Sequence, residues 1–197
     1  MTHPYTIPNL LTLLRIVLIP AVVTLFYADV LGFGMDRGWA AMACGLLFAA
    51  AGITDSIDGW LARRWGQVSP LGAFLDPVAD KLIVAVALVL IVSQDPRWFV
   101  TLTAAVIIGR EITVSALREW MAEIGARRKV AVSALGKYKT ILQITGLSLM
   151  LFREPLLGLP VYDLGLVLTI VAAVLTLWSM VAYMRAAWPD LRGSLHA

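Results

Sequence analysis

Residues 55–80, DSIDGWLARRWGQVSPLGAFLDPVAD, decide the fold because they place four carboxylates between two apolar segments. Asp55 and Asp58 are three residues apart, and Asp76 and Asp80 are four apart. On a helix, both spacings put the paired carboxylates on one face. Ionisable residues at the ends of apolar segments are costly in lipid and are therefore candidates for function. The stretch predicts two neighbouring helices that bring four carboxylates together at one membrane surface.

The rest of the chain is as apolar as these flanks. Of its 197 residues, 60% are hydrophobic and 15% are charged, and the mean hydropathy is +0.84. Soluble domains are about 45–50% apolar and roughly 25% charged, and a membrane span needs ~20 apolar residues. We therefore expect an all-α integral membrane protein with one transmembrane catalytic domain over residues 1–197. The six predicted spans cover about residues 10–31, 39–57, 74–92, 98–117, 132–152 and 162–183.

The basic residues are distributed unequally between the two sides of this topology. The loops predicted on one side carry only Arg37, Arg97 and Arg153, whereas most of the other basic residues lie on the opposite side. Positive residues mark the cytoplasmic face, so we expect both termini and the aspartates to lie there. The net charge of +3 follows this orientation and does not indicate a nucleic-acid partner.

Four converging carboxylates repel one another unless a cation lies between them. All-oxygen ligation suits Mg²⁺, Mn²⁺ or Ca²⁺, and two such ions commonly clamp a phosphoryl group. Gly59 would allow a substrate close to the backbone, and Arg63, one turn further, could neutralise a phosphate. Two alternatives stay open at this point. Asp76 before Pro77 could be a helix N-cap, and the carboxylates could line an ion pathway in a transporter.

The motif Asp55-x2-Asp58-Gly59-x2-Ala62-Arg63-x8-Gly72-x3-Asp76-x3-Asp80 resembles that of the CDP-alcohol phosphotransferase family, without a departure. The resemblance implies a membrane enzyme with six transmembrane helices, usually a homodimer, in which an alcohol displaces CMP from a CDP-linked donor. It implies that the four aspartates bind two divalent ions, Mg²⁺ or Mn²⁺, and that Asp80 is the general base. It also implies that the CDP-linked donor contacts Gly59, Ala62, Arg63 and Gly72.

Three further segments extend the resemblance over essentially the whole chain: IPNLLTLLR at 7–15, GREITVSALREWM at 109–121 and VAVSALGKYKT at 130–140. They look like the bacterial members that join CDP-diacylglycerol to sn-glycerol 3-phosphate, which gives phosphatidylglycerophosphate and CMP. The resemblance implies the bacterial cytoplasmic membrane, with the active site facing the cytoplasm. Sister enzymes that use inositol phosphate, serine or phosphatidylglycerol as acceptor stay open as alternatives.

An anionic acceptor needs cations, and the fourth and fifth predicted spans supply them. Arg110 and Arg118 are eight residues apart, on roughly one helical face, and Lys137 and Lys139 begin the next span at the same level. Arginine offers bidentate phosphate contacts, and lysine offers a point charge. We predict that these four residues bind glycerol 3-phosphate.

The first predicted span carries a weaker polar pattern. Asn9, Thr12 and Arg15 are spaced three apart and therefore share one helical face. We predict that they line the CDP-diacylglycerol site, although Asn9 after Pro8 could equally be an N-cap. The expected mechanism is direct displacement at the phosphorus esterified to the lipid, with Asp80 taking the proton of the acceptor hydroxyl.

Overall fold

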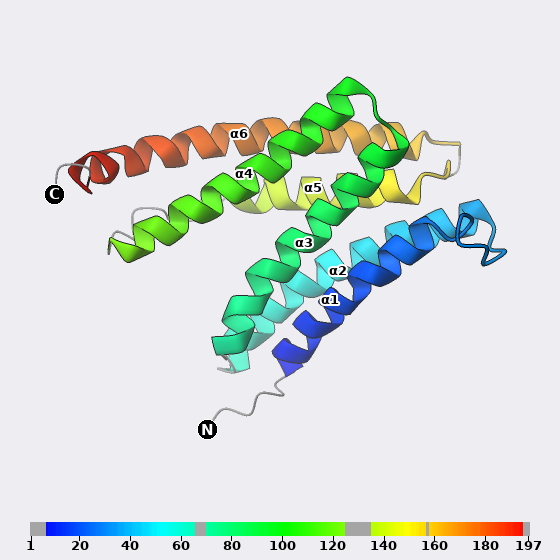
Figure 1. The fold of residues 1–197 in the computed structure, drawn as a ribbon, viewed down its shortest axis with the longest axis horizontal. Helices are drawn as coiled ribbons and strands as arrows, with labels where there is room; N and C mark the ends of the chain where they lie inside the picture. The colour runs from blue at the N-terminus through cyan, green and yellow to red at the C-terminus, as the bar shows by residue number, and fades with distance from the viewer. Residues whose placement is uncertain (1–6, 66–69, 125–134, 157, 195–197) are drawn as a thin grey trace.

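The computed structural model describes residues 7–65, 70–124, 135–156 and 158–194, and its regular structure is helical (Figure 1). Within these ranges, the side chains of residues 7–9, 11, 55–65, 70, 71, 73, 135–137, 186 and 189–194 lie outside the description. The all-α class is therefore as predicted. The helices in chain order are α1 (Ile7–Phe26), α2 (Arg37–Trp65), α3 (Pro70–Gln94), α4 (Trp98–Glu123), α5 (Leu135–Phe152) and α6 (Val161–Ser194).

The helices form two arms of three. In the first arm, α1 packs against α2 and α3, and in the second arm, α6 packs against α4 and α5. The arms touch where α2 meets α5 and where α3 meets α4 and α5. In Figure 1 the arms join near the connections α1–α2, α3–α4 and α5–α6, and they diverge toward their other ends. The diverging ends are those at which α2 ends and α3 begins, so the aspartate stretch lies there.

The hydrophobic core lies where the two arms are in contact. Phe48 of α2, Ala87 of α3, Ile107 of α4 and Leu147 of α5 are each at most 2% exposed and belong to one cluster. The closest approach in the second arm is between α5 and α6. A Cβ atom on Gly165 would lie 2.6 Å from the carbonyl oxygen of Gly146. Small residues allow such approach between membrane helices, so α5 and α6 pack with their backbones close together.

Three helices in the described part of the chain are long and apolar enough to cross a membrane by length and composition: Arg37–Thr54, Trp98–Glu123 and Val161–Arg185. The apolar part of α1, Thr12–Phe26, is shorter. Trp39 and Trp98 are strongly exposed at the first turns of α2 and α4, where an interfacial anchor is expected. The structure thus supports a membrane protein, and the count of six spans stays a prediction.

Several boundaries differ from the apolar stretches. The first predicted span is too long at its end, because α1 stops at Phe26 and residues 27–32 form hydrogen-bonded turns that close at Gly32, whose φ is +75°. In contrast, α2, α4 and α6 continue past their apolar stretches, to Trp65, Glu123 and Ser194. Hydropathy indicates which residues suit lipid. The hydrogen bonds of a helix backbone can continue into polar residues past the apolar stretch, so a helix can be longer than the span that hydropathy predicts.

Candidate active site

The aspartate motif lies on two helices at the diverging end of the first arm. Asp55 and Asp58 lie in the C-terminal part of α2 together with Gly59, Ala62 and Arg63, all of whose side chains are outside the described residues. Gly72, Asp76 and Asp80 lie in the first half of α3, where Gly72 is buried and both carboxylates are half-buried. The N-cap alternative for Asp76 is wrong, because α3 begins six residues earlier at Pro70 and includes Pro77.

Helix α1 supplies a direct partner for the motif. The hydroxyl of Thr12 donates a hydrogen bond to Oδ1 of Asp76. Thr12 is fully buried, and Arg15, one turn further along α1, is only 2% exposed. A buried donor restricts the rotamers of the carboxylate that it contacts. Thr12 therefore orients Asp76, a role that the sequence reasoning did not assign. The side chain of Asn9 lies outside the described residues.

Arg110 is the most enclosed of the described cations in the second arm. It lies in α4 and is 8% exposed. Its Nη2 donates to Oε1 of Glu111 at 2.8 Å and to Oγ1 of Thr176 at 3.4 Å. Its Nε is buried and has no hydrogen-bond partner among the described residues. A buried donor left open is costly, so Arg110 suits an anionic ligand that completes its hydrogen bonds.

Two further cations, Lys139 of α5 and Arg118 of α4, also contact α6. Nζ of Lys139, in α5, donates to Oγ of Ser179 at 3.2 Å. The guanidinium of Arg118 lies over the ring of Tyr183, 5.7 Å from its centroid. The charges of Arg110 and Arg118 both act on Lys139. Arg110, Arg118 and Lys139 thus each contact α6, and their role in binding the acceptor stays a prediction. The side chain of Lys137 lies outside the described residues.

Sequence reasoning missed the residues of α6 that hold these cations. Thr176, Ser179 and Tyr183 contact Arg110, Lys139 and Arg118 respectively. Their spacing is i, i+3 and i+7, which places them on one face of a helix. Within a span that otherwise appears uniformly apolar, this pattern of three hydroxyl-bearing residues was the available signal.

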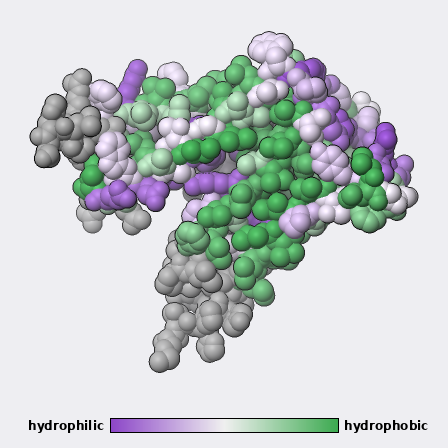
Figure 2. Space-filling view, in the orientation of Figure 1, coloured by the Kyte–Doolittle hydropathy of each residue, from purple (hydrophilic) through white to green (hydrophobic). Residues whose placement is uncertain are grey.

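The two arms face each other electrostatically across the site. The charge of Asp80, on α3, acts on Arg110, on α4. Figure 2 shows a notch between the arms, with hydrophilic surface at its inner margin. No group of three metal-ligating side chains is found among the described residues, and the side chains of two predicted ligands, Asp55 and Asp58, lie outside them. The predicted ligands are carboxylates, and Asp76 among them is oriented by a hydrogen bond from Thr12. Carboxylate oxygens suit hard divalent ions such as Mg²⁺ or Mn²⁺.

Comparisons with known proteins identify the family of the chain. Residues 5–178 match the family model described as CDP-alcohol phosphatidyltransferase. Proteins named CDP-diacylglycerol–glycerol-3-phosphate 3-phosphatidyltransferase from Escherichia coli (strain K12), Salmonella typhimurium and Shigella flexneri are each 51% identical to this chain over 187 residues. Each alignment covers 95% of this chain and 97% of the relative.

Proposed function

Because the chain belongs to the CDP-alcohol phosphatidyltransferase family, we propose that it is the membrane enzyme named by its relatives. It transfers the phosphatidyl group of CDP-diacylglycerol to sn-glycerol 3-phosphate, giving phosphatidylglycerophosphate and CMP. The identity of 51% over 95% of the chain supports both the reaction and the acceptor. The reaction serves the synthesis of anionic phospholipid.

The match to the family model over residues 5–178 and the 51% identity to the named relatives carry the proposal. The placement of charge is consistent with it, because Asp76 and Asp80 lie on α3 of the first arm and Arg110 and Lys139 lie on α4 and α5 of the second. A donor pyrophosphate held near the carboxylates and an acceptor phosphate held by the cations would therefore meet between the arms. Holding two reactants in this way lowers the entropic part of the barrier.

The proposed acceptor site consists of Arg110, Arg118, Lys137 and Lys139. Support comes from the buried guanidinium of Arg110 and from the contacts that α6 makes with three of these cations. With its phosphate held there, glycerol 3-phosphate would present a hydroxyl toward Asp80. Asp80 would accept the proton of that hydroxyl as it attacks the lipid-bearing phosphorus, acting as a general base.

The proposed donor site is built on the first arm. Asp55, Asp58, Asp76 and Asp80 would hold two divalent ions, Mg²⁺ or Mn²⁺, which when bound would balance the pyrophosphate charge and stabilise the departing CMP. Gly59, Ala62, Arg63 and Gly72 would contact the CDP part of the donor. Asn9, Thr12 and Arg15 would complete that site from α1, and the hydrogen bond from Thr12 to Asp76 supports their position beside it.

We also propose that the protein lies in the bacterial cytoplasmic membrane and crosses it six times. Both termini and the active site would then lie on the cytoplasmic side. The assembled state that we propose is a homodimer. The asymmetry of basic residues supports the orientation. Arg118, Lys139 and Arg185 belong to the diverging helix ends. At the opposite end lie Arg37, which begins α2, and Arg97 and Arg153, which lie in connections. The homodimer rests on the family resemblance alone.

The test is release of CMP from CDP-diacylglycerol by the purified protein in detergent, with and without Mg²⁺ or Mn²⁺. Glycerol 3-phosphate, inositol phosphate, serine and phosphatidylglycerol are compared as acceptors. We expect release that requires both the divalent ion and glycerol 3-phosphate. Release with another acceptor only would keep the reaction class and overturn the acceptor, and no release with any of them would overturn the enzyme assignment.

A further inference from the structure

The amide of Gln143, on α5, is buried and makes no hydrogen bond with any described residue. The residue as a whole is 5% exposed. Its amide is not among the fully enclosed polar groups that lack a partner, so the amide atoms keep some accessible surface and lie at an opening. Buried polar groups in native structures are almost always hydrogen-bonded, which makes this amide a candidate for binding a ligand.

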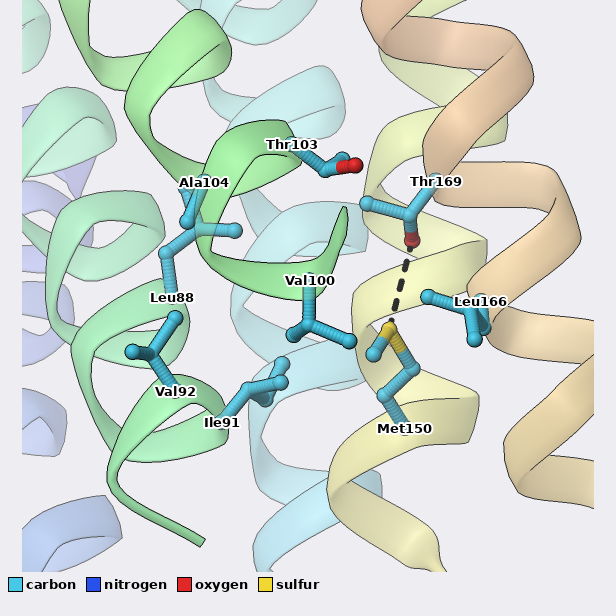
Figure 3. Close-up of a pocket in the computed structure, with 9 residues that line it drawn as sticks. All are labelled: Leu88, Ile91, Val92, Val100, Thr103, Ala104, Met150, Leu166 and Thr169. Atoms are coloured by element: carbon cyan, nitrogen blue, oxygen red, sulfur yellow. Dashed lines mark hydrogen bonds between the residues drawn. The ribbon is translucent and has the colours of Figure 1, made fainter. Parts of the chain in front are cut away.

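Another buried polar group of the second arm shows the ordinary arrangement. The hydroxyl of Thr169, on α6, lies 2.8 Å from the carbonyl oxygen of Gly165 and 3.6 Å from Sδ of Met150 (Figure 3). Most of the residues around it are apolar, and the hydroxyl is bound within the protein. The amide of Gln143 has no such partner among the described residues and is therefore available to a ligand.

Gln143 lies between two contacts that fix how α5 packs against α6. On one side, a Cβ atom on Gly146 would lie 2.4 Å from Oγ1 of Thr169. On the other side, Lys139 donates to Oγ of Ser179. Gln143 follows Lys139 by four residues and therefore shares its helical face. The amide thus lies beside the stretch of α6 between Thr169 and Ser179.

This stretch of α6 brings the amide to the level of the predicted acceptor cations. It contains Thr176, which accepts a hydrogen bond from Nη2 of Arg110 at 3.4 Å. Gln143 lies one helical turn, ~5 Å, from Lys139 in the direction in which the arms join. An acceptor whose phosphate is bound by Arg110 and Lys139 would therefore place its remaining atoms within reach of the amide.

The same turn of α5 also touches the first arm. A Cβ atom on Gly52, in α2, would lie 2.6 Å from Cγ2 of Ile144, the residue after Gln143. Gly52 precedes Asp55, the first aspartate of the motif, by three residues. This turn therefore lies at the inner end of the space between the arms, where donor and acceptor are proposed to meet.

An amide is better suited to a hydroxyl than to a phosphate. Its carbonyl oxygen accepts and its NH₂ group donates, and a hydroxyl likewise does both. A phosphate offers acceptors only, and arginine and lysine bind it more strongly. Glycerol 3-phosphate has one primary and one secondary hydroxyl. With the primary hydroxyl directed to Asp80 as the nucleophile, the secondary hydroxyl is the group that needs a partner.

We propose that Gln143 binds the secondary hydroxyl of glycerol 3-phosphate and thereby determines acceptor specificity. This role rests on the proposed function, from which it takes the acceptor. A site built to hydrogen-bond a substrate hydroxyl rejects an analogue that lacks it, because the polar group of the site is then left unpaired. 3-Hydroxypropyl phosphate, which lacks only the secondary hydroxyl, should therefore bind less tightly than glycerol 3-phosphate.

The test measures incorporation of labelled glycerol 3-phosphate into lipid by the purified full-length protein, with CDP-diacylglycerol and Mg²⁺. 3-Hydroxypropyl phosphate is added as an unlabelled competitor. In the wild type, we expect it to compete about tenfold more weakly than unlabelled glycerol 3-phosphate. In Gln143→Leu, kcat/KM for glycerol 3-phosphate should fall about tenfold, because a hydrogen bond is lost and the hydroxyl is left unpaired. The competition constant of the analogue should not change.

The melting temperature in detergent separates this role from a structural one. Removing a buried amide that has no partner should not destabilise the fold, so Gln143→Leu should melt at or above the temperature of the wild type. A lower melting temperature, with equal losses for glycerol 3-phosphate and the analogue, would mean that Gln143 only holds α5 in place, and would overturn the proposal. Gln94→Leu is the matched control, because Gln94 is exposed at the end of α3 away from the aspartates, and both of its constants should equal those of the wild type.

The same experiment distinguishes failure of this role from failure of the proposed function. A wild type that incorporates no glycerol 3-phosphate would contradict the proposed function and, with it, the role of Gln143. An active wild type with which both compounds compete equally well would contradict the role of Gln143 alone. Unchanged kcat/KM for glycerol 3-phosphate in Gln143→Leu would do the same, and would mean that the amide binds water only.

Discussion

The two arms build their halves of the site differently. In the first arm, the predicted metal ligands lie toward helix ends, and a hydrogen bond from Thr12 of the neighbouring helix orients Asp76. In the second arm, Arg110, Lys139 and Arg118 each have a partner on one face of α6. Carboxylates that await divalent ions need little from the protein besides orientation, whereas grouped cations repel and must be fixed separately. The comparison predicts that the first arm governs turnover and the second arm governs affinity for the acceptor.

The largest effect should come from the first arm. Asp80→Asn removes both the proposed base and a proposed ligand, and general-base catalysis alone contributes about 10²–10⁴-fold. We expect kcat to fall by about 10³-fold or more, measured as CMP release at saturating glycerol 3-phosphate. Asp163→Asn is the control, because Asp163 is exposed in the first turn of α6, at the opposite end of the molecule.

Asp163→Asn should keep full activity and the same melting temperature as the wild type. If Asp80→Asn were to turn over at a rate close to that of the control, the assignment of the carboxylates to catalysis would fail. Removing divalent ions with a chelator should abolish the wild-type rate, and adding Mg²⁺ or Mn²⁺ should restore it.

The second arm should respond mainly in the KM for the acceptor. Arg110→Gln removes the buried guanidinium and its open Nε donor, and hydrogen bonds to charged groups contribute about 1.5–3 kcal/mol. We expect the KM for glycerol 3-phosphate to rise by about 10- to 100-fold, with a much smaller change in the KM for CDP-diacylglycerol. An equal rise in the KM for glycerol 3-phosphate and the KM for CDP-diacylglycerol would contradict the proposal that the second arm binds the acceptor and the first arm the donor. Arg185→Gln, an exposed arginine of α6, is the control.

Packing within the second arm should matter for stability. A Cβ atom on Gly146 would lie 2.4 Å from Oγ1 of Thr169 and 2.8 Å from the carbonyl oxygen of Gly165, so Gly146→Ala must push α5 and α6 apart. Overpacking of this kind costs about 1–3 kcal/mol, and we expect a lower melting temperature in detergent. Gly109→Ala is the matched control, since nothing lies within 4 Å of its added Cβ atom. Equal melting temperatures in the two variants would contradict the close packing.

Tyr183 offers a finer test of how α6 supports the cations. A cation–π contact of a partly exposed arginine contributes about 0.5–1 kcal/mol. Tyr183→Leu should therefore raise the KM for glycerol 3-phosphate by about two- to fivefold, and Tyr183→Phe, which keeps the ring, should raise it less. The comparison of the two variants separates the ring from the hydroxyl. A larger loss in Tyr183→Phe than in Tyr183→Leu would show that the ring contact with Arg118 is unimportant.

The sequence predicted the first arm better than the second. Charges at the ends of apolar spans stand out because lipid disfavours them, and this identified Asp76, Asp80 and Arg110 as candidates. Thr176, Ser179 and Tyr183 did not stand out, because hydroxyl side chains are tolerated in membrane helices and their function depends on which helix they face. The packing of α6 against α4 and α5 is tertiary structure, which a local sequence pattern does not predict.

Helix boundaries were missed for a related reason. Hydropathy extended the first span through Val30 and Leu31, which are apolar but lie in the turns after α1. It also ended the sixth span near Tyr183, whereas α6 continues to Ser194 and packs Ala187 against Leu117 and Met121 of α4. Arg118 lies beside this small cluster, so the extension that hydropathy did not detect supports the acceptor site.

The smallest expected effect lies where the arms join. Asp95 follows α3, accepts from Arg97 and Tyr162, and has its pKa lowered to about 2 by the Arg97 guanidinium. Because its folded pKa is below the ordinary value of about 3.9, its ionised form stabilises the fold fully above about pH 4, and this contribution is lost as the pH falls through about 2. Asp95→Asn should therefore lower the melting temperature slightly at pH 7, with a difference from the wild type that shrinks below pH 4. Since the Arg97 guanidinium is half-exposed, this difference in melting temperature should also become smaller in high salt. A difference in melting temperature that persists unchanged at low pH would mean that Asp95 acts through packing and not through its charge.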